Sequence, residues 1–207
     1  MDLRRFDLIT LGLLIINTLF ALYNIHLNGL DNFINGTIGY EGMMQAGAMD
    51  SNSSTLSWWT AMFTHFSLSH YAMNMFSLVS IGILTRNFYG HILYLIGYLG
   101  SGMITSICTH ILSDDLTVSA GASGAIMGIL GMCLVASLLT RDVNMTGFFG
   151  SILFVVMFQV FMTFVTPDVS IIGHISGLIG GCIIGVILML FKNSILKIKE
   201  RYYDGYK

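Results

Sequence analysis

Two polar side chains stand out in stretches that are otherwise apolar and uncharged, Ser123 and His174. Ser123 lies in Gly121-Ala-Ser-Gly124, and His174 follows Gly173 near the start of another apolar stretch. A serine hydroxyl is a weak nucleophile until a base takes its proton, and the neutral imidazole of histidine suits that task near pH 7. The pair therefore predicts acyl transfer, with Ser123 as the nucleophile and His174 as the base.

An acyl-transfer site also needs donors for the oxyanion of its tetrahedral intermediate, and each donor typically contributes a few kcal/mol. His70 and Asn74 are four residues apart, so on a helix they share one face about 6 Å apart. We expect both side chains to act as donors, together with a backbone N–H at the start of the helix that carries Ser123. No carboxylate is close enough in sequence to orient His174, so we predict a Ser–His dyad rather than a triad.

The sequence lacks the residues that other kinds of intramembrane site require. No Asp or Glu lies within any predicted membrane span, which argues against an aspartyl dyad and against a carrier that uses buried carboxylates. The sequence has no H-E-x-x-H zinc motif. Cys108, Cys133 and Cys182 fall in separate spans without paired spacing, which is typical of buried apolar packing. We expect no metal and no cofactor.

The chain that carries these residues has the composition of a membrane protein. Its 207 residues are 55% hydrophobic and 10% charged, whereas a soluble domain has about 25% charged residues. Its mean hydropathy is +0.77. The length predicts a single domain, residues 1–207. The net charge of −2 provides no basic face, so we expect the lipid bilayer and no nucleic acid among the partners.

Six charge-free stretches of 23 residues or more can each hold a helix that crosses a bilayer, which takes about 20 mostly apolar residues. We therefore predict an all-α fold, a polytopic bundle of six transmembrane helices, with spans at about 8–27, 70–86, 91–112, 120–140, 147–166 and 171–191. A long outer loop, 28–69, joins the first two spans, and residues 192–207 form a cytoplasmic tail. Trp58 and Trp59 should lie at the interface, where indole rings are favoured.

The distribution of cations predicts the orientation of the bundle. If the N-terminus is inside, the inner segments hold all nine basic residues: Arg4, Arg5, Arg86, Arg141, Lys192, Lys197, Lys199, Arg201 and Lys207. Since Lys and Arg are enriched on the cytoplasmic side, both termini are predicted to be cytoplasmic. The first apolar stretch could instead be a signal peptide. It is longer than the apolar core of a typical signal peptide, however, and no A-x-A cleavage site follows it.

Glycines recur at about every fourth position in two of the predicted spans. They are Gly121, Gly124, Gly128 and Gly131 in the fourth span, and Gly173, Gly177, Gly181 and Gly185 in the sixth. Small residues at this spacing let helix backbones approach closely in lipid. We therefore expect the fourth and sixth spans to pack together, which brings Ser123 toward His174 near the outer surface.

Three motifs together resemble the rhomboid family of intramembrane serine proteases. They are His70-Tyr-Ala-Met-Asn74, Gly121-Ala-Ser-Gly124 and Gly173-His174, and they lie on the second, fourth and sixth predicted spans in the family's order. The resemblance extends over all six spans.

The resemblance assigns a role to each residue of these motifs. It implies that Ser123 is the nucleophile and His174 the base, and that His70, Asn74 and the Ser123 N–H bind the oxyanion. It also implies a structural role in the outer loop for His65. The activity implied is that of an intramembrane serine endopeptidase, which cleaves peptide bonds in or near transmembrane segments of substrate proteins. We expect a multi-pass protein of the bacterial plasma membrane.

The sequence is also compatible with two other functions. The first is a non-proteolytic rhomboid-like protein that binds client transmembrane helices, whose signature would be the loss of Ser123 or His174; both are present. The second is a small-solute transporter or channel, which predicts polar residues through the full depth of the bundle or an inverted repeat. The polar layer in this sequence stops near the outer third of the spans.

Overall fold

A computed structural model of the protein describes residues 7–114, 117–139, 146–166 and 169–204. These residues form an all-α structure, as predicted. The helices are α1 (Leu8–Asn28), α2 (Leu30–Asn35), α3 (Tyr40–Gln45), α4 (Thr55–Thr60), α5 (Leu68–Tyr89), α6 (His91–Leu112), α7 (Ser123–Leu139), α8 (Thr146–Val165) and α9 (Ile171–Asp204). Over the described ranges the only β-type pairing is an isolated bridge between Met49 and Ser119.

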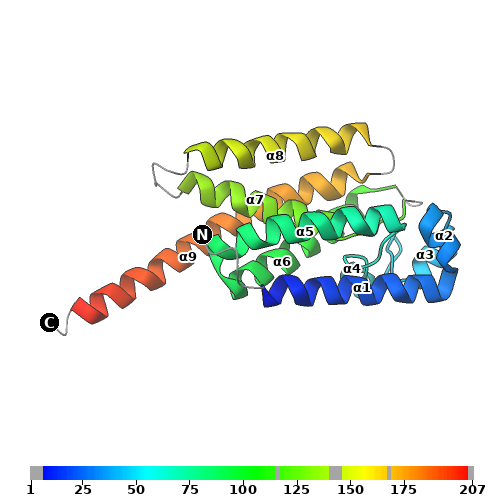
Figure 1. Ribbon diagram of the computed structural model, residues 1–207, viewed down its shortest axis with the longest axis horizontal. Coiled ribbons are helices and arrows are strands. Elements are labelled where there is room, and N and C mark those ends of the chain that lie inside the picture. The colour runs from blue at the N-terminus through cyan, green and yellow to red at the C-terminus, as the bar shows by residue number, and fades with distance from the viewer. Residues whose placement is uncertain (1–6, 115–116, 140–145, 167–168, 205–207) are drawn as a thin grey trace.

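The long helices run side by side, and α2 and α3 lie at one end of the bundle (Figure 1). At the opposite end α1 begins, and α9 extends beyond the other helices (Figure 1). Helix α9 continues to Asp204, past the range of 171–191 predicted for the sixth span. Four of the cations that support the predicted orientation, Arg4, Arg5, Arg141 and Lys207, lie outside the described residues.

Three helical segments of the described chain are long and apolar enough to cross a membrane by length and composition: Leu8–Asn28, His91–Leu112 and Ile171–Lys192. Ser123–Leu139 and Phe149–Val165 are shorter apolar helices. Helix α5 is as long as α6, at 22 residues. It is less apolar because it carries His70, Asn74 and several hydroxyl side chains.

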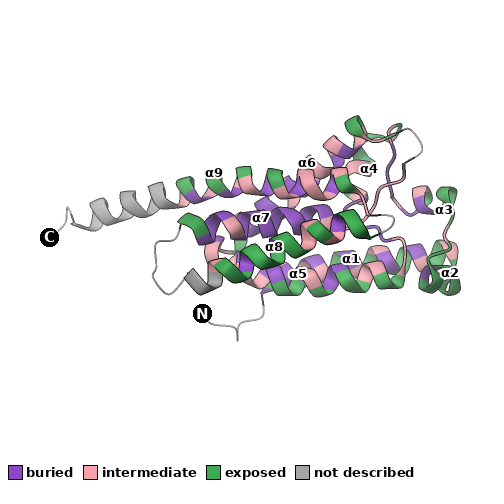
Figure 2. Cartoon of the chain, turned by 90° about the horizontal axis from the view of Figure 1, so that it is seen from above, coloured by how far each residue is buried: buried purple, intermediate pink, exposed green. Residues whose placement is uncertain are grey.

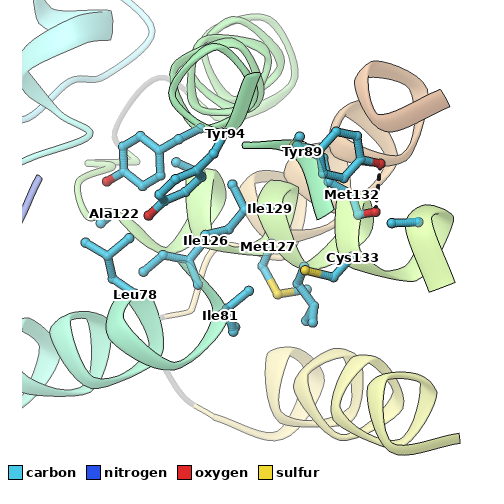
Figure 3. Close-up of a cluster of buried hydrophobic side chains, with 14 of the residues drawn as sticks. Leu78, Ile81, Tyr89, Tyr94, Ala122, Ile126, Met127, Ile129, Met132 and Cys133 are labelled. Atoms are coloured by element: carbon cyan, nitrogen blue, oxygen red, sulfur yellow. Dashed lines mark hydrogen bonds between the residues drawn. The ribbon is translucent and has the colours of Figure 1, made fainter. Parts of the chain in front are cut away.

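Helix α7 forms the centre of the bundle. Every residue from Gly124 to Cys133 is buried, and the purple ribbon of α7 lies among the other helices in Figure 2. Helices α5, α6, α8 and α9 all pack against it. A helix that is apolar on all sides is typical of a core position. Figure 3 shows Leu78 of α5 and Tyr94 of α6 gathered around Ile126 and Ile129 of α7.

The contact between α7 and α9 is built from glycines, as the spacing predicts. A Cβ atom at Gly181 would overlap the backbone of Gly128, and one at Gly177 would overlap the carbonyl oxygen of Gly124. Tyr89 fixes the part of this contact near Met132, because its hydroxyl lies 3.0 Å from the Met132 oxygen of α7 (Figure 3) and 3.2 Å from the Gly185 oxygen of α9. The backbones of α7 and α9 therefore approach as closely as glycine allows.

This contact predicts that Gly181→Ala will destabilise the protein. Overpacking a core typically costs about 1–3 kcal/mol, and the clash here is with a helix backbone that has no rotamer to change. We expect a lower thermal unfolding midpoint in detergent micelles. The matched control is Gly12→Ala on α1, since nothing lies within 4 Å of a Cβ built there. Equal midpoints for the two variants would show that the glycine contact does not hold α7 against α9.

Candidate active site

The segment before Ser123 has a backbone conformation that suits glycine. Gly121 has a φ of +127°, which L residues rarely adopt, and Ser123 is the first residue of α7. A Cβ at Gly121 would lie 2.7 Å from Cε1 and 2.9 Å from Nε2 of His70, and 3.8 Å from Nδ2 of Asn74. The two side chains predicted to bind an oxyanion therefore lie against the chain two residues before the predicted nucleophile.

Helix α5 positions these two side chains. Its N-cap is Ser67, whose hydroxyl oxygen accepts a hydrogen bond from the His70 N–H at 3.2 Å. The buried Asn74 side chain donates from Nδ2 to the His70 carbonyl oxygen at 3.0 Å. A carboxamide nitrogen carries two hydrogens, so one N–H of Asn74 remains available beside Gly121.

The glycine contact places Ser123 and His174 at the same level of the bundle. Gly124 follows Ser123 directly, and its carbonyl oxygen lies against Gly177, which is three residues after His174 on α9. Thr105 of α6 completes this junction, since its hydroxyl donates to the Gly173 carbonyl at 3.3 Å. Among the described residues no hydrogen bond joins the Ser123 hydroxyl to His174.

Sequence reasoning missed one partner of His174. Thr163 of α8 is 2% exposed, and its Oγ1 lies 2.9 Å from Nδ1 of His174. The available signal was weak: Thr163 is a polar residue within an apolar predicted span, and such residues are functional candidates. Sequence spacing does not predict that Thr163 lies beside His174 in the fold.

A family model of the rhomboid domain matches residues 52–191, which include all four predicted site residues. The chain belongs to the rhomboid family. It is similar to Rhomboid protease GluP of Bacillus subtilis, with 34% identity over 127 residues that make up 60% of this chain and 25% of that protein.

Two eukaryotic rhomboid relatives are also similar to this chain. RHOMBOID-like protein 6, mitochondrial, of Arabidopsis thaliana is 30% identical over 132 residues, or 63% of this chain and 43% of that protein. Rhomboid-like protease 2 of Toxoplasma gondii is 27% identical over 144 residues, or 69% of this chain and 50% of that protein. The chain therefore spans a quarter to a half of these three relatives.

Residues 28–69 of this rhomboid protein, the predicted outer loop, hold the backbone that leads to Ser123. Met49 and Ser119 exchange two backbone hydrogen bonds, of 3.0 and 2.7 Å, and the Gly121 N–H donates to the Ala61 oxygen at 2.8 Å. A small cavity beside this segment is lined in part by Thr105, Ser119 and Gly121. These hydrogen bonds fix the backbone that leads into α7. Sequence spacing alone did not predict them.

His65 links the outer loop to His70. It is fully buried, its Nδ1 lies 3.1 Å from the Phe63 carbonyl oxygen, and its own carbonyl oxygen accepts from Asn24 Nδ2 at 2.9 Å. Its ring meets the His70 ring edge-on, with centroids 5.2 Å apart. Burial, helped by the nearby His70, lowers the pKa of His65 to about 3, so the ring stays neutral near pH 7. These contacts support the structural role that we expected for His65.

The carboxylate of Asp50 is held by three hydrogen bonds within this loop. It accepts hydrogen bonds from the Tyr40 hydroxyl at 2.5 Å, the Ser53 hydroxyl at 2.7 Å and the Asn52 N–H at 2.9 Å. The Tyr40 bond is the largest cause that holds the pKa of Asp50 below its ordinary value. The stability that this shift contributes is fully present above the unfolded pKa of about 3.9 and is lost as pH falls through the folded pKa.

We therefore predict that Tyr40→Phe makes the loop open at a higher pH than in the native protein. Without the hydroxyl, the folded pKa of Asp50 rises toward its unfolded value, so protonation opens the loop earlier. Hydrogen–deuterium exchange of residues 46–53, corrected for the intrinsic pH dependence of exchange, measures the opening midpoint. Tyr23→Phe on the exposed face of α1 is the control. The same midpoint in Tyr40→Phe and native protein would contradict the assignment.

Among the described residues there is no group of three His, Cys, Asp or Glu side chains that could hold a metal ion. The nucleophile, the base and the oxyanion donors predicted from sequence come from α5, α7 and α9. Thr163 adds a contact from α8.

Proposed function

We propose that this rhomboid protein is an intramembrane serine endopeptidase that cleaves in or near transmembrane segments of other membrane proteins. The observation that carries the proposal is the position of His70 and Asn74 against Gly121, two residues before Ser123. A close glycine contact between α7 and α9 brings His174 to the same level. A client-binding protein would not need oxyanion donors beside a serine.

The proposed reaction is acyl transfer in two stages. Ser123 Oγ attacks the carbonyl carbon of the scissile peptide while its proton passes to His174. The oxyanion that forms accepts hydrogen bonds from the Ser123 N–H, His70 and Asn74. His174 then gives the proton to the leaving amine as the C–N bond breaks, which leaves an acyl ester on Ser123.

Water completes the reaction. A water molecule attacks the ester carbon, His174 takes its proton, and collapse of the second intermediate releases the carboxylic acid and restores the Ser123 hydroxyl. The cavity lined in part by Thr105, Ser119 and Gly121 lies beside the segment that precedes Ser123, and its polar groups suit water.

In this proposal six helices, α1 and α5–α9, cross the membrane, and both termini are cytoplasmic. The support is the positive-inside distribution of all nine cations and the three helical segments that are long and apolar enough to span. We place the protein in a bacterial plasma membrane. Substrate helices that unwind readily should be preferred, because a regular helix keeps its own carbonyl groups in hydrogen bonds.

The proposal is tested by reconstituting the protein in liposomes with a panel of single-span reporter proteins. Mass spectrometry of the products should locate cleavage sites in or near the reporter spans. Reporters that are bound across the panel but never cut would contradict the proposal and favour the client-binding alternative. Thiol labelling of introduced cysteines from each side of the liposome tests the six-span arrangement separately.

A further inference from the structure

We propose that Thr163 of α8 is a positioning residue for His174, and that its hydroxyl oxygen selects the ring tautomer that can act as the base. The proposal rests on the proposed function, since it gives His174 a reason to be oriented. It adds a third side chain, Thr163, to the Ser123–His174 dyad predicted from the sequence.

Counting hydrogens assigns the direction of the Thr163 bonds. Thr163 Oγ1 lies 2.8 Å from the Gln159 carbonyl oxygen and 2.9 Å from Nδ1 of His174. A carbonyl oxygen can only accept, and a hydroxyl has one hydrogen to donate. We therefore assign the hydroxyl hydrogen to the Gln159 contact, which leaves the Thr163 oxygen to accept from Nδ1–H of His174.

This direction fixes the state of the other ring nitrogen. A neutral imidazole carries one N–H, so a hydrogen on Nδ1 leaves a lone pair on Nε2. Nε2 is then the atom that takes the proton of Ser123. When the ring becomes an imidazolium, Nδ1–H is still present and the Thr163 bond is kept. The same contact therefore orients the ring before and after proton transfer.

The burial pattern of α8 supports a dedicated role for this hydroxyl. Phe161 and Phe164 are 60% and 62% exposed on the outer side of α8, whereas Thr163 between them is 2% exposed. The Thr163 hydroxyl is therefore packed inside the bundle, where its oxygen lies against Nδ1 of His174. An Nδ1–H left without an acceptor in a buried site is costly, which favours moving the hydrogen to Nε2.

The variants that test the proposal separate the hydroxyl from the shape of the side chain. Thr163→Val keeps the branched shape but has no acceptor, and Thr163→Ser keeps the hydroxyl. Thr166→Val is the matched control, because Thr166 lies three residues further on and is exposed. Thermal unfolding of each purified variant in detergent establishes that it is folded before the assay.

The first readout is the rate at which an alkyl fluorophosphonate reacts with Ser123. In this reaction the Oγ–P bond forms, the P–F bond breaks, and the serine proton goes to His174. We expect Thr163→Val to lower the maximal reaction rate constant on the order of tenfold, the equivalent of one hydrogen bond, with little change in half-saturating probe concentration. Thr163→Ser should stay within about twofold of the native protein, given that it retains the acceptor.

The second readout is the tautomer itself. In protein labelled with ¹⁵N-histidine, the NMR signals of the His174 ring are assigned by their loss in His174→Ala. We expect hydrogen on Nδ1 in the native protein and a gain of the Nε2–H form in Thr163→Val. A merely structural role for Thr163 would leave the tautomer unchanged.

The outcomes distinguish this proposal from the function on which it rests. If the native protein fails to react at Ser123, the proposed function is contradicted, and this proposal with it. If the native protein reacts at Ser123 but Thr163→Val matches it in rate and tautomer, the role of Thr163 is overturned while the proposed function stands. A predominant Nε2–H form in the native protein would overturn it as well.

Discussion

Replacing Ser123 or His174 with alanine is expected to reduce cleavage of a reporter in liposomes by about 10⁴-fold or more. Ser123→Ala removes the atom that forms the acyl ester, and His174→Ala removes the group that takes the serine proton. The double variant should be no slower than the slower single variant, because the two residues act as a unit. Initial rates of product formation measure the effect.

Controls for these two variants come from other helices. Ser80→Ala removes an exposed hydroxyl that donates to the Phe76 oxygen of its own helix, and His26→Ala removes an exposed imidazole of α1. Both should cleave at the native rate. Cleavage that persists in Ser123→Ala at more than a trace would show that another residue is the nucleophile.

Loss of either oxyanion donor is expected to have the next largest effect. Removing one such donor typically lowers kcat by about 10²-fold or more. We predict this loss for Asn74→Leu, which keeps the volume of the side chain, and for His70→Ala. KM should change little, because the donors bind charge that develops only in the transition state. The Ser123 N–H remains in both variants, so the double variant should lose less than the product of the two effects.

The matched control for these donors is Asn87→Leu, an exposed amide at the other end of α5. It should leave kcat unchanged. If Asn74→Leu and His70→Ala raised KM without lowering kcat, the two side chains would be binding substrate rather than the oxyanion. The position of both side chains beside Gly121 would then need another explanation.

Much of the helical framework follows from physical features that are local in sequence. An uncharged run between Gly90 and Asp114 predicts α6, since few alternatives satisfy backbone hydrogen bonds in lipid. Glycine spacing predicts the α7–α9 contact, because close approach depends on the lack of a side chain at each contact position. The chemistry of Ser123 and His174 follows from their residue types.

Other features depend on contacts between segments that are far apart in the chain. The hydrogen bond between Thr163 and His174 depends on how α8 is rotated against α9, and a polar residue in an apolar span does not encode that rotation. The pairing of Met49 with Ser119 joins the outer loop to the start of α7 across about 70 residues, so no spacing rule predicts it.

The most direct test of the central claim, that His174 activates Ser123, is to find where an alkyl fluorophosphonate attaches. The folded protein in detergent is treated with the probe, digested and analysed by mass spectrometry, in parallel with His174→Ala. We predict a phosphonyl adduct on Ser123 in the native protein and none in His174→Ala over the same time. An adduct on a different serine, or equal labelling of Ser123 in His174→Ala, would contradict the claim.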